Sequence, residues 1–250
     1  MNALTARAFF TSLLEDRRQR QSSLEVSFRQ AQKLAGVLDS HKSHHHGALS
    51  HLMAVSDEVV SQVEDYGAQL AQQKIEPAYH NRQHFADALL ALGAFLQLAP
   101  QIPVDQKQLM LLTILVHDFG HRGLGHQDAA ISHEAISVKL LSTTAINQLS
   151  QAEQARISQW ILGTNTSQLA LVNSQHLMHP DNQAYLMQSL INDADIATSF
   201  ISSLAHPLTR LILQELGAKN PSDDAIDKAY LSFRSQYFIT TSIAKTYLGL

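Results

Sequence analysis

The chain has 250 residues, 45% of them hydrophobic, which is enough to bury a core in one domain or at most two. Its formal net charge of -4 offers no electrostatic reason to expect nucleic acid or an anionic membrane as a partner. The absence of cysteine excludes disulfides, thiolate metal sites and thiol nucleophiles, so a bound metal would need His, Asp, Glu or water as ligands.

The N-terminal stretch lacks the order of a secretory signal, because Arg7 interrupts it and Glu15 and Asp16 follow closely. The longest apolar run covers residues 109–116 and is far too short to span a bilayer. We therefore expect a cytoplasmic protein with no membrane partner.

Helical periodicity runs along the chain, and no stretch of strand length alternates apolar and polar residues. The predicted helices cover residues 6–38 (as one helix or two), 48–73, 80–98, 105–116, 128–141, 153–162, 182–203, 207–216 and 222–248. Asp128 is expected to cap the helix over 128–141. No repeat or linker divides the sequence. We predict an all-α fold with one domain over 1–250, in which 1–70 form an N-terminal helical portion and 79–200 form the core.

Five histidines crowd between the first two helical regions: His41, His44, His45, His46 and His51. Their neighbours are polar or glycine, which favours a solvated turn, and their spacing does not describe a closed coordination sphere. We predict an exposed loop here rather than a metal site.

A second set of histidines lies at helical spacing and is joined by carboxylates. His80 and His84 are four residues apart, which puts both rings on one helix face. Taken alone, this pair would favour a surface stripe or two satisfied core histidines. His117 and Asp118, however, directly follow the longest apolar run, so a buried helix delivers an imidazole and a carboxylate together. An unpaired carboxylate there would be costly, and a metal ion is the simplest partner for it.

Three further residues extend this set. His121 lies four residues after His117, in a glycine-containing loop. Asp193 and Asp195 lie in an otherwise apolar helix, so at least one should face inward. Asp193 fits a helix cap or a solvated face as well as it fits a ligand, whereas Asp195 fits the inward position better. The core over 79–200 is therefore predicted to bind metal.

Two segments of this core resemble family signatures. Residues 79–87 read Y-H-N-R-Q-H-F-A-D and match the pattern Y-H-N-x-x-H-x-x-D, and residues 117–123 read H-D-F-G-H-R-G and match H-D-x-x-H-x-G. In this order, and with Asp195 later, they resemble the HD superfamily of metal-dependent phosphohydrolases. More narrowly, they are similar to the class I 3',5'-cyclic nucleotide phosphodiesterases. The resemblance extends over residues 79–200.

The resemblance implies a role for each of these side chains. The first metal would have four ligands: His84, His117, Asp118 and Asp195. Asp118 would bridge to a second ion, His121 would hold that ion's water shell, and His80 would be the general acid that protonates a leaving alkoxide. Zn²⁺ at the histidine-rich site and Mg²⁺ or Mn²⁺ at the second are implied, with iron as the alternative.

The chain departs from the family pattern close to the implied second metal. His133 matches a histidine that braces the site, but Ala130 stands where a glutamate is expected, so Glu134 is the residue that would compensate. His126 replaces an asparagine. An additional imidazole near the second metal would change which ion is preferred.

The segment after the last predicted ligand is short, with 55 of the 250 residues following Asp195. In it, Gln236 and Phe238 resemble the glutamine and phenylalanine that clamp the purine in these enzymes, although the aromatic residue is one position early. With Tyr79 from the first motif, they are the predicted substrate contacts.

We therefore expect a metal-dependent phosphohydrolase whose partner is a small phosphoester, most simply a 3',5'-cyclic nucleotide. A nucleotidase of the same superfamily is the nearest alternative. An HD-type di-iron oxygenase is another, which His126 and His133 would support. A binding module that has lost its metal would not need the intact ligand set. No nucleic-acid partner is expected, and a homodimer is left open.

Overall fold

The structure is a computed structural model that describes residues 3–39, 47–123 and 131–250. Over these ranges all regular secondary structure is helical, which confirms the predicted all-α class. The α-helices are α1 (Ala3–Arg20), α2 (Leu24–Leu34), α4 (Gly47–Gln72), α5 (Arg82–Gln97), α6 (Val104–Val116), α7 (His133–Leu140), α8 (Gln151–Leu162), α9 (Thr166–Met178), α10 (Gln183–Ile196), α11 (Ser202–Glu215), α12 (Asp223–Gln236) and α13 (Ser242–Leu248). Short 3₁₀ turns cover Leu141–Thr143, Ala145–Gln148 and Ala197–Phe200.

Within the described residues, no single helix is both long and apolar enough to cross a membrane. One bent pair, Gln183–Phe200 with Ser202–Glu215, reaches that length and composition only when its two arms, which meet at 96°, are taken together. Asp128, His126, Ala130 and four of the five clustered histidines (His41, His44, His45 and His46) lie outside the described residues.

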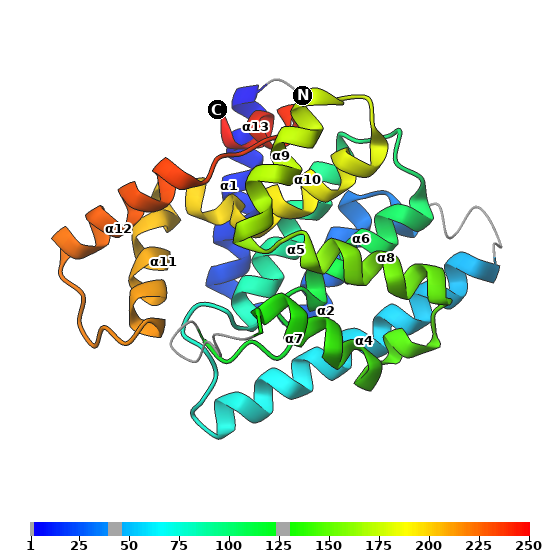
Figure 1. Cartoon of the computed structure of the whole chain (residues 1–250), viewed down its shortest axis with the longest axis horizontal. Helices are drawn as coiled ribbons and strands as arrows, with labels where there is room; N and C mark the ends of the chain where they lie inside the picture. The colour runs from blue at the N-terminus through cyan, green and yellow to red at the C-terminus, as the bar shows by residue number, and fades with distance from the viewer. Residues whose placement is uncertain (1–2, 40–46, 124–130) are drawn as a thin grey trace.

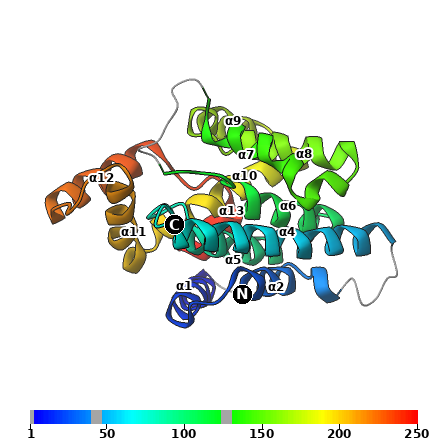
Figure 2. The same ribbon diagram turned by 90° about the horizontal axis from the view of Figure 1, so that it is seen from below.

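Helices α5 and α6 form the centre of the molecule (Figure 1). All residues of α5 from His84 to Leu96 are buried, and so are all residues of α6 from Lys107 to Val116. Helices that are apolar on every side must be covered on every side. Figure 2 shows α1 and α2 below this centre and α7, α8 and α9 above it, while α10 packs against α5 and α6.

Helix α2 packs closely on α5 because Gly93 has no side chain. A Cβ atom added there would lie 2.7 Å from the Cα of Ala31 and 2.8 Å from its carbonyl oxygen. Neither atom can move without displacing α2, so the contact requires glycine in the middle of a helix, where it would otherwise be unfavourable. Gly93 therefore fixes how near the N-terminal helices lie to α5.

Buried charges also fasten the outer helices to the centre. Asp87 of α5, one turn after His84, accepts hydrogen bonds from Arg17 at 3.1 Å and from Arg18, both on α1. The ammonium group of Lys107 on α6 donates hydrogen bonds to the carbonyl oxygens of Ala35 and Leu96, at 3.2 and 2.9 Å. These carbonyls lie at the ends of α2 and α5, where helices leave such groups unpaired, so one lysine closes both helix ends.

Several predicted helix boundaries differ from the structure. The region over 6–38 contains two helices, because Ser23 caps the start of α2 and accepts a hydrogen bond from the Val26 amide. The helix predicted from residue 128 has its first described turn at His133, where Ser132 is the N-cap. Helix α9 was not predicted, since its polar glutamines and asparagine obscure an apolar face.

The predicted continuous helix over 222–248 is wrong. It is divided into α12 and α13 by residues 237–241, which are not helical. Asp193 of α10 accepts hydrogen bonds from the amides of Thr240 and Thr241, each at 2.8 Å, and from the Thr241 hydroxyl at 2.7 Å. Those amides cannot also bond within a helix, so a tertiary contact overrides the helical pattern.

The Gly93 contact predicts a loss of stability when a single methyl group is added. Gly93→Ala should lower the free energy of unfolding by about 1–3 kcal/mol in urea, because overpacking outweighs the better helix propensity of alanine. Gly47→Ala is the matched control, since a Cβ there meets no atom within 4 Å. Equal stability of the two variants would contradict the close packing of α2 on α5.

Candidate metal centre

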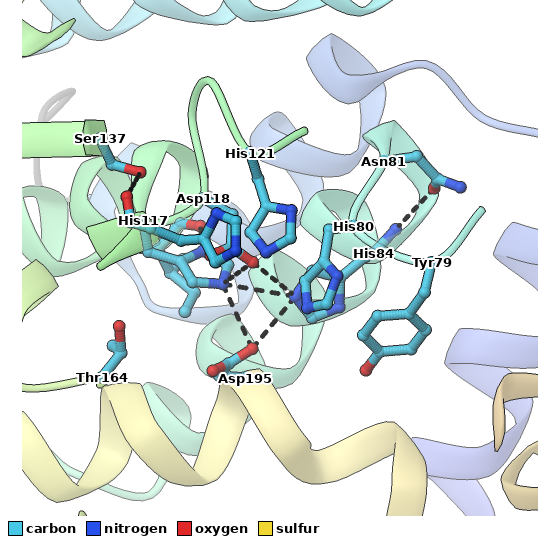
Figure 3. Close-up of polar contacts among 12 residues, drawn as sticks. Tyr79, His80, Asn81, His84, His117, Asp118, His121, Ser137, Thr164 and Asp195 are labelled. Carbon is cyan, nitrogen blue, oxygen red and sulfur yellow. Dashed lines mark hydrogen bonds and ion pairs between the residues drawn. The ribbon is translucent and has the colours of Figure 1, made fainter. Parts of the chain in front are cut away.

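Four side chains from three parts of the core meet at one point, and they are the four predicted ligands (Figure 3). His84 lies in the first turn of α5, which Asn81 caps by accepting hydrogen bonds from the amides of Gln83 and His84. His117 and Asp118 follow the last turn of α6, and Asp195 lies in the last turn of α10. The three central helices thus bring their ends together here.

The distances among these atoms fit a single ion. The Nε2 atoms of His84 and His117 are 3.3 Å apart. Oδ1 of Asp195 lies 3.1 Å from the first nitrogen and 3.2 Å from the second, and Oδ2 of Asp118 lies 3.6 and 3.1 Å from them. Ligands about 2.1 Å from one metal ion, at tetrahedral or octahedral angles, are separated by roughly 3.0–3.4 Å. The four atoms could therefore hold a metal ion between them.

The tautomer of His117 follows from its other ring nitrogen. Nδ1 lies 2.8 Å from the carbonyl oxygen of Ile114, which can only accept a hydrogen bond, so Nδ1 carries a proton. In the neutral ring, Nε2 then presents a lone pair to His84 and to both carboxylates. A carbonyl behind a histidine is the usual support for a metal-ligating ring.

The centre needs positive charge, and the pKa values show it. Burial alone would lower the pKa of His84, but Asp118 and Asp195 outweigh burial and raise that pKa to about 9. The pKa of His117 is raised well above its usual value against the same opposing effect of burial. Burial would raise the pKa of each carboxyl group, but the two imidazoles instead lower both. Without metal, the centre therefore binds two protons beside two carboxylates, and a divalent cation could replace them without changing the total charge.

Next to this centre, His80 forms a partly buried pair with Glu215, the last residue of α11. Its Nδ1 atom lies 2.6 Å from Oε1 of Glu215. The other carboxylate oxygen accepts hydrogen bonds from the amides of Tyr79 and His80 at 2.9 and 3.1 Å. Burial would raise the pKa of Glu215, but the hydrogen bond from His80 lowers it to about 2, so the carboxylate is charged. Glu215 thus fixes both the position and the tautomer of His80.

His121 lies between two other histidine rings in a stack. Its ring centre is 4.0 Å from that of His80 and 3.8 Å from that of His133, with nearly parallel planes. Nδ1 of His121 accepts a hydrogen bond from the amide of Gly123 at 2.9 Å. Burial, with the neighbouring charge of His80, lowers the pKa of His121 to about 3, so the ring is neutral and its Nε2 atom carries the proton. His121 is therefore a donor, which suits the predicted contact with metal-bound water better than direct ligation.

His80, His121 and Glu215 are close enough to hold a second ion, but their atoms already have partners. Nδ1 of His80 is paired with the carboxylate of Glu215. Nδ1 of His121 accepts a hydrogen bond from the amide of Gly123. The facing nitrogen and oxygen atoms of His84, His117, Asp118 and Asp195, by contrast, contact one another across the centre. We therefore regard the second group as a hydrogen-bonded network, and a second metal ion bridged by Asp118 stays a prediction.

The structure places the predicted substrate contacts in different surroundings. Tyr79 is buried, with its ring 4.8 Å from those of His80 and His84. Burial and the charge of Asp195 raise the pKa of its hydroxyl, which is therefore protonated at neutral pH. Gln236 is exposed and donates to Ser232 on its own helix, and Phe238 is 51% exposed. Within the described residues, neither hydrogen-bonds to the centre, and their role stays a prediction.

Asp193 does not belong to the group of four, and its carboxylate instead accepts hydrogen bonds from Thr240 and Thr241. It is only 1% exposed, and burial raises its pKa to about 6 in spite of its three donors. From the sequence, a helix cap or a solvated helix face was as consistent with Asp193 as a ligand role. The carboxylate is in fact buried at the N-terminus of α13, where Thr241 is the cap.

The two aspartates of α10 should respond differently to the same substitution. Asp195→Asn removes a charged ligand and should lower zinc affinity at least about tenfold, with little effect on unfolding. Asp193→Asn should retain zinc and lower the free energy of unfolding by about 1–3 kcal/mol, because an amide cannot accept all three hydrogen bonds. Zinc titration and urea unfolding measure the two effects. Equal loss of zinc in both variants would refute the assignment of Asp195.

Comparison of the chain with models of protein families, with curated proteins and with solved structures found no match. The function of the chain is therefore inferred from the side-chain contacts of the centre and from its two motifs.

Proposed function

We propose that the chain is a metal-dependent phosphohydrolase that cleaves a small phosphoester, most simply a 3',5'-cyclic nucleotide. The observation that carries this proposal is the His80–Glu215 pair beside the ligand set, with the ring of His80 5.6 Å from that of His84. A phosphoester with a poor leaving group needs both charge neutralisation at phosphorus and a proton for the departing oxygen. The two groups of residues supply these two requirements.

The four ligands would hold a divalent ion, which supplies polarisation of the phosphoryl oxygens and a bound water of lowered pKa. His84, His117, Asp118 and Asp195 offer nitrogen and oxygen donors, and zinc is the ion that we propose for them. A second ion, Mg²⁺ or Mn²⁺, would share Asp118 and take water for its other positions.

His80 would act as the general acid. Because Nδ1 is held by Glu215, Nε2 is the atom left to carry a proton toward the leaving oxygen. The carboxylate of Glu215 holds the ring through Nδ1 and, through the amides of Tyr79 and His80, fixes the backbone from which the ring projects. His121 keeps its Nε2 proton and can donate a hydrogen bond to water or to a phosphoryl oxygen, but its lowered pKa makes it a poor base.

One observation favours a second candidate, an oxygenase with two iron ions. His133 is buried, and within the described residues neither of its ring nitrogens has a hydrogen-bond partner. An imidazole in this state can ligate an additional metal, and di-iron centres use such ligands. Iron content and colour of the purified protein separate this candidate from a zinc hydrolase.

The acid role of His80 predicts a dependence on the leaving group. His80→Ala should retain metal and slow hydrolysis of a 3',5'-cyclic nucleotide by roughly 10²- to 10⁴-fold, the usual contribution of a general acid. The loss should be much smaller for bis(p-nitrophenyl) phosphate, whose leaving group needs no proton. Glu215→Gln should show the same selectivity with a smaller loss, while Glu25→Gln, on the exposed first turn of α2, should be unaffected.

The outcomes that contradict this proposal are specific. Equal slowing of both substrates by His80→Ala would remove His80 as the acid. Failure of the zinc- or manganese-loaded protein to hydrolyse any member of a panel of cyclic nucleotides, linear nucleotides and aryl phosphates would remove the hydrolase itself.

A further inference from the structure

We propose a second ligand site, apart from the metal centre, in a cleft between α8, α9 and α10 that takes a planar heteroaromatic molecule with one anionic group. The cleft has a volume of about 760 Å³, within the range of sites for small molecules. Its lining comes from the C-terminal half of α8, one face of α9 and the N-terminal half of α10, with Gln106 of α6 at one end.

The charge of the lining favours an anion. None of the described residues that line the cleft is acidic, although the chain as a whole carries a net charge of -4. Arg156 is the one cation in the lining, and its guanidinium donates to the amide oxygen of Gln106 at 2.5 Å. Within the described residues no carboxylate pairs with Arg156, so its remaining N–H groups are available to a ligand carboxylate or phosphate.

Glutamine amides dominate the rest of the polar lining. The six glutamines are Gln106, Gln159, Gln168, Gln175, Gln183 and Gln188. Gln106, Gln183 and Gln188 already use part of their amides in hydrogen bonds within the protein. An amide has two N–H groups and an oxygen with two lone pairs, so the remaining capacity of this wall suits a ligand edge with N–H and C=O groups rather than a simple ion. Together with Arg156, the wall matches a heterocycle joined to a single anionic group.

The floor of the cleft is already ordered. Gln188 is 8% exposed and donates its amide N–H groups to the carbonyl oxygen of Trp160 and to Asn192, both at 3.0 Å. A Cβ atom on Gly163 would lie 2.5 Å from the Gln188 amide, so the side chain of Gln188 would have to move if residue 163 carried one. With both N–H groups used, the amide oxygen of Gln188 has acceptor capacity for an N–H of the ligand.

Apolar side chains make up most of the remaining lining. Trp160 and Met187 are buried at the base, while Leu162 and Leu171 are 43% and 56% exposed at the rim. An exposed leucine pair beside a tryptophan gains stability when a planar ring covers it. A nucleoside monophosphate combines such a ring with N–H and C=O edges and a phosphate, and it is the probe that the lining fits.

The cleft and the metal centre share α10 but do not overlap. Gln188 precedes Asp195 by seven residues, which is about 10 Å along the helix. Ligands can therefore occupy both places at once, and the existence of the cleft site does not depend on the reaction at the metal centre.

The only tryptophan of the chain, Trp160, makes the site directly observable. We expect adenosine 5'-monophosphate to change the emission of Trp160 saturably, both in the metal-loaded wild type and in Asp195→Asn, with affinities within about twofold of each other. Arg156→Gln, an exposed substitution, should weaken binding at least about tenfold, the size of one charge-assisted contact. Adenosine lacks the phosphate, so it should bind the wild type and Arg156→Gln with equal affinity. Arg29→Gln, at an arginine of α2 that pairs with Asp57 and does not line the cleft, is the control and should leave nucleotide binding unchanged.

Equilibrium dialysis of the nucleotide provides a count that does not depend on fluorescence. Asp195→Asn should bind one equivalent, and Asp195→Asn combined with Arg156→Gln should bind none at the same concentration. Three results would overturn the proposal: no binding by Asp195→Asn, an affinity unchanged by Arg156→Gln, or equal competition by inorganic phosphate alone. None of them bears on whether the metal centre hydrolyses phosphoesters.

Discussion

Two imidazole nitrogens and two carboxylate oxygens converge on one point inside an apolar helical core, and the folded chain needs positive charge at that point. A change of tautomer at His117 cannot supply a proton on Nε2, because the Ile114 carbonyl keeps the proton of the neutral ring on Nδ1. Either two protons or one divalent cation must balance Asp118 and Asp195. The cation satisfies all four atoms at once, whereas protons leave two imidazolium rings facing each other at 3.3 Å.

The surrounding fold is arranged to keep these four atoms in place. The four candidate ligands lie at the ends of α5, α6 and α10, the helices with the most completely buried sequences, so their backbones have little freedom. Asp87 holds α1 against α5, and Lys107 closes the ends of α2 and α5. Asp193 fastens the C-terminal segment to α10 two residues before the ligand Asp195. Each of these buried charged groups has its hydrogen-bond partners outside the centre, whereas the four side chains of the centre contact one another and could hold a metal ion.

The grouping of the four candidate ligands could be predicted from the sequence because it depends on local spacing and on the contrast with apolar neighbours. His84, His117 and Asp118 stand out at the ends of strongly apolar helices, and the structure brings them together with Asp195. The sequence could not separate Asp193 from Asp195 fully, since the partners of Asp193 are amides 47 and 48 residues away. Residues whose partners are distant in the chain give no local signal.

Glu215 shows the same limit more clearly. It lies 135 residues from His80, at the end of an amphipathic helix where a glutamate is ordinary, and only the folded chain shows that it is buried against the histidine. The break between α12 and α13 was missed for a related reason, because the contact that causes it comes from α10. The helical class and most helix positions, by contrast, follow from periodicity within single segments. Local patterns thus predict elements and ligands, while tertiary contacts determine which polar residues support them.

Anomalous X-ray diffraction from crystals of the zinc-loaded protein tests the central claim most directly. The account predicts a metal peak at about 2.0–2.2 Å from Nε2 of His84, Nε2 of His117 and a carboxylate oxygen of each of Asp118 and Asp195. The claim would be contradicted by crystals grown in excess zinc that show no peak among these four side chains, with both imidazoles instead hydrogen-bonded to the carboxylates.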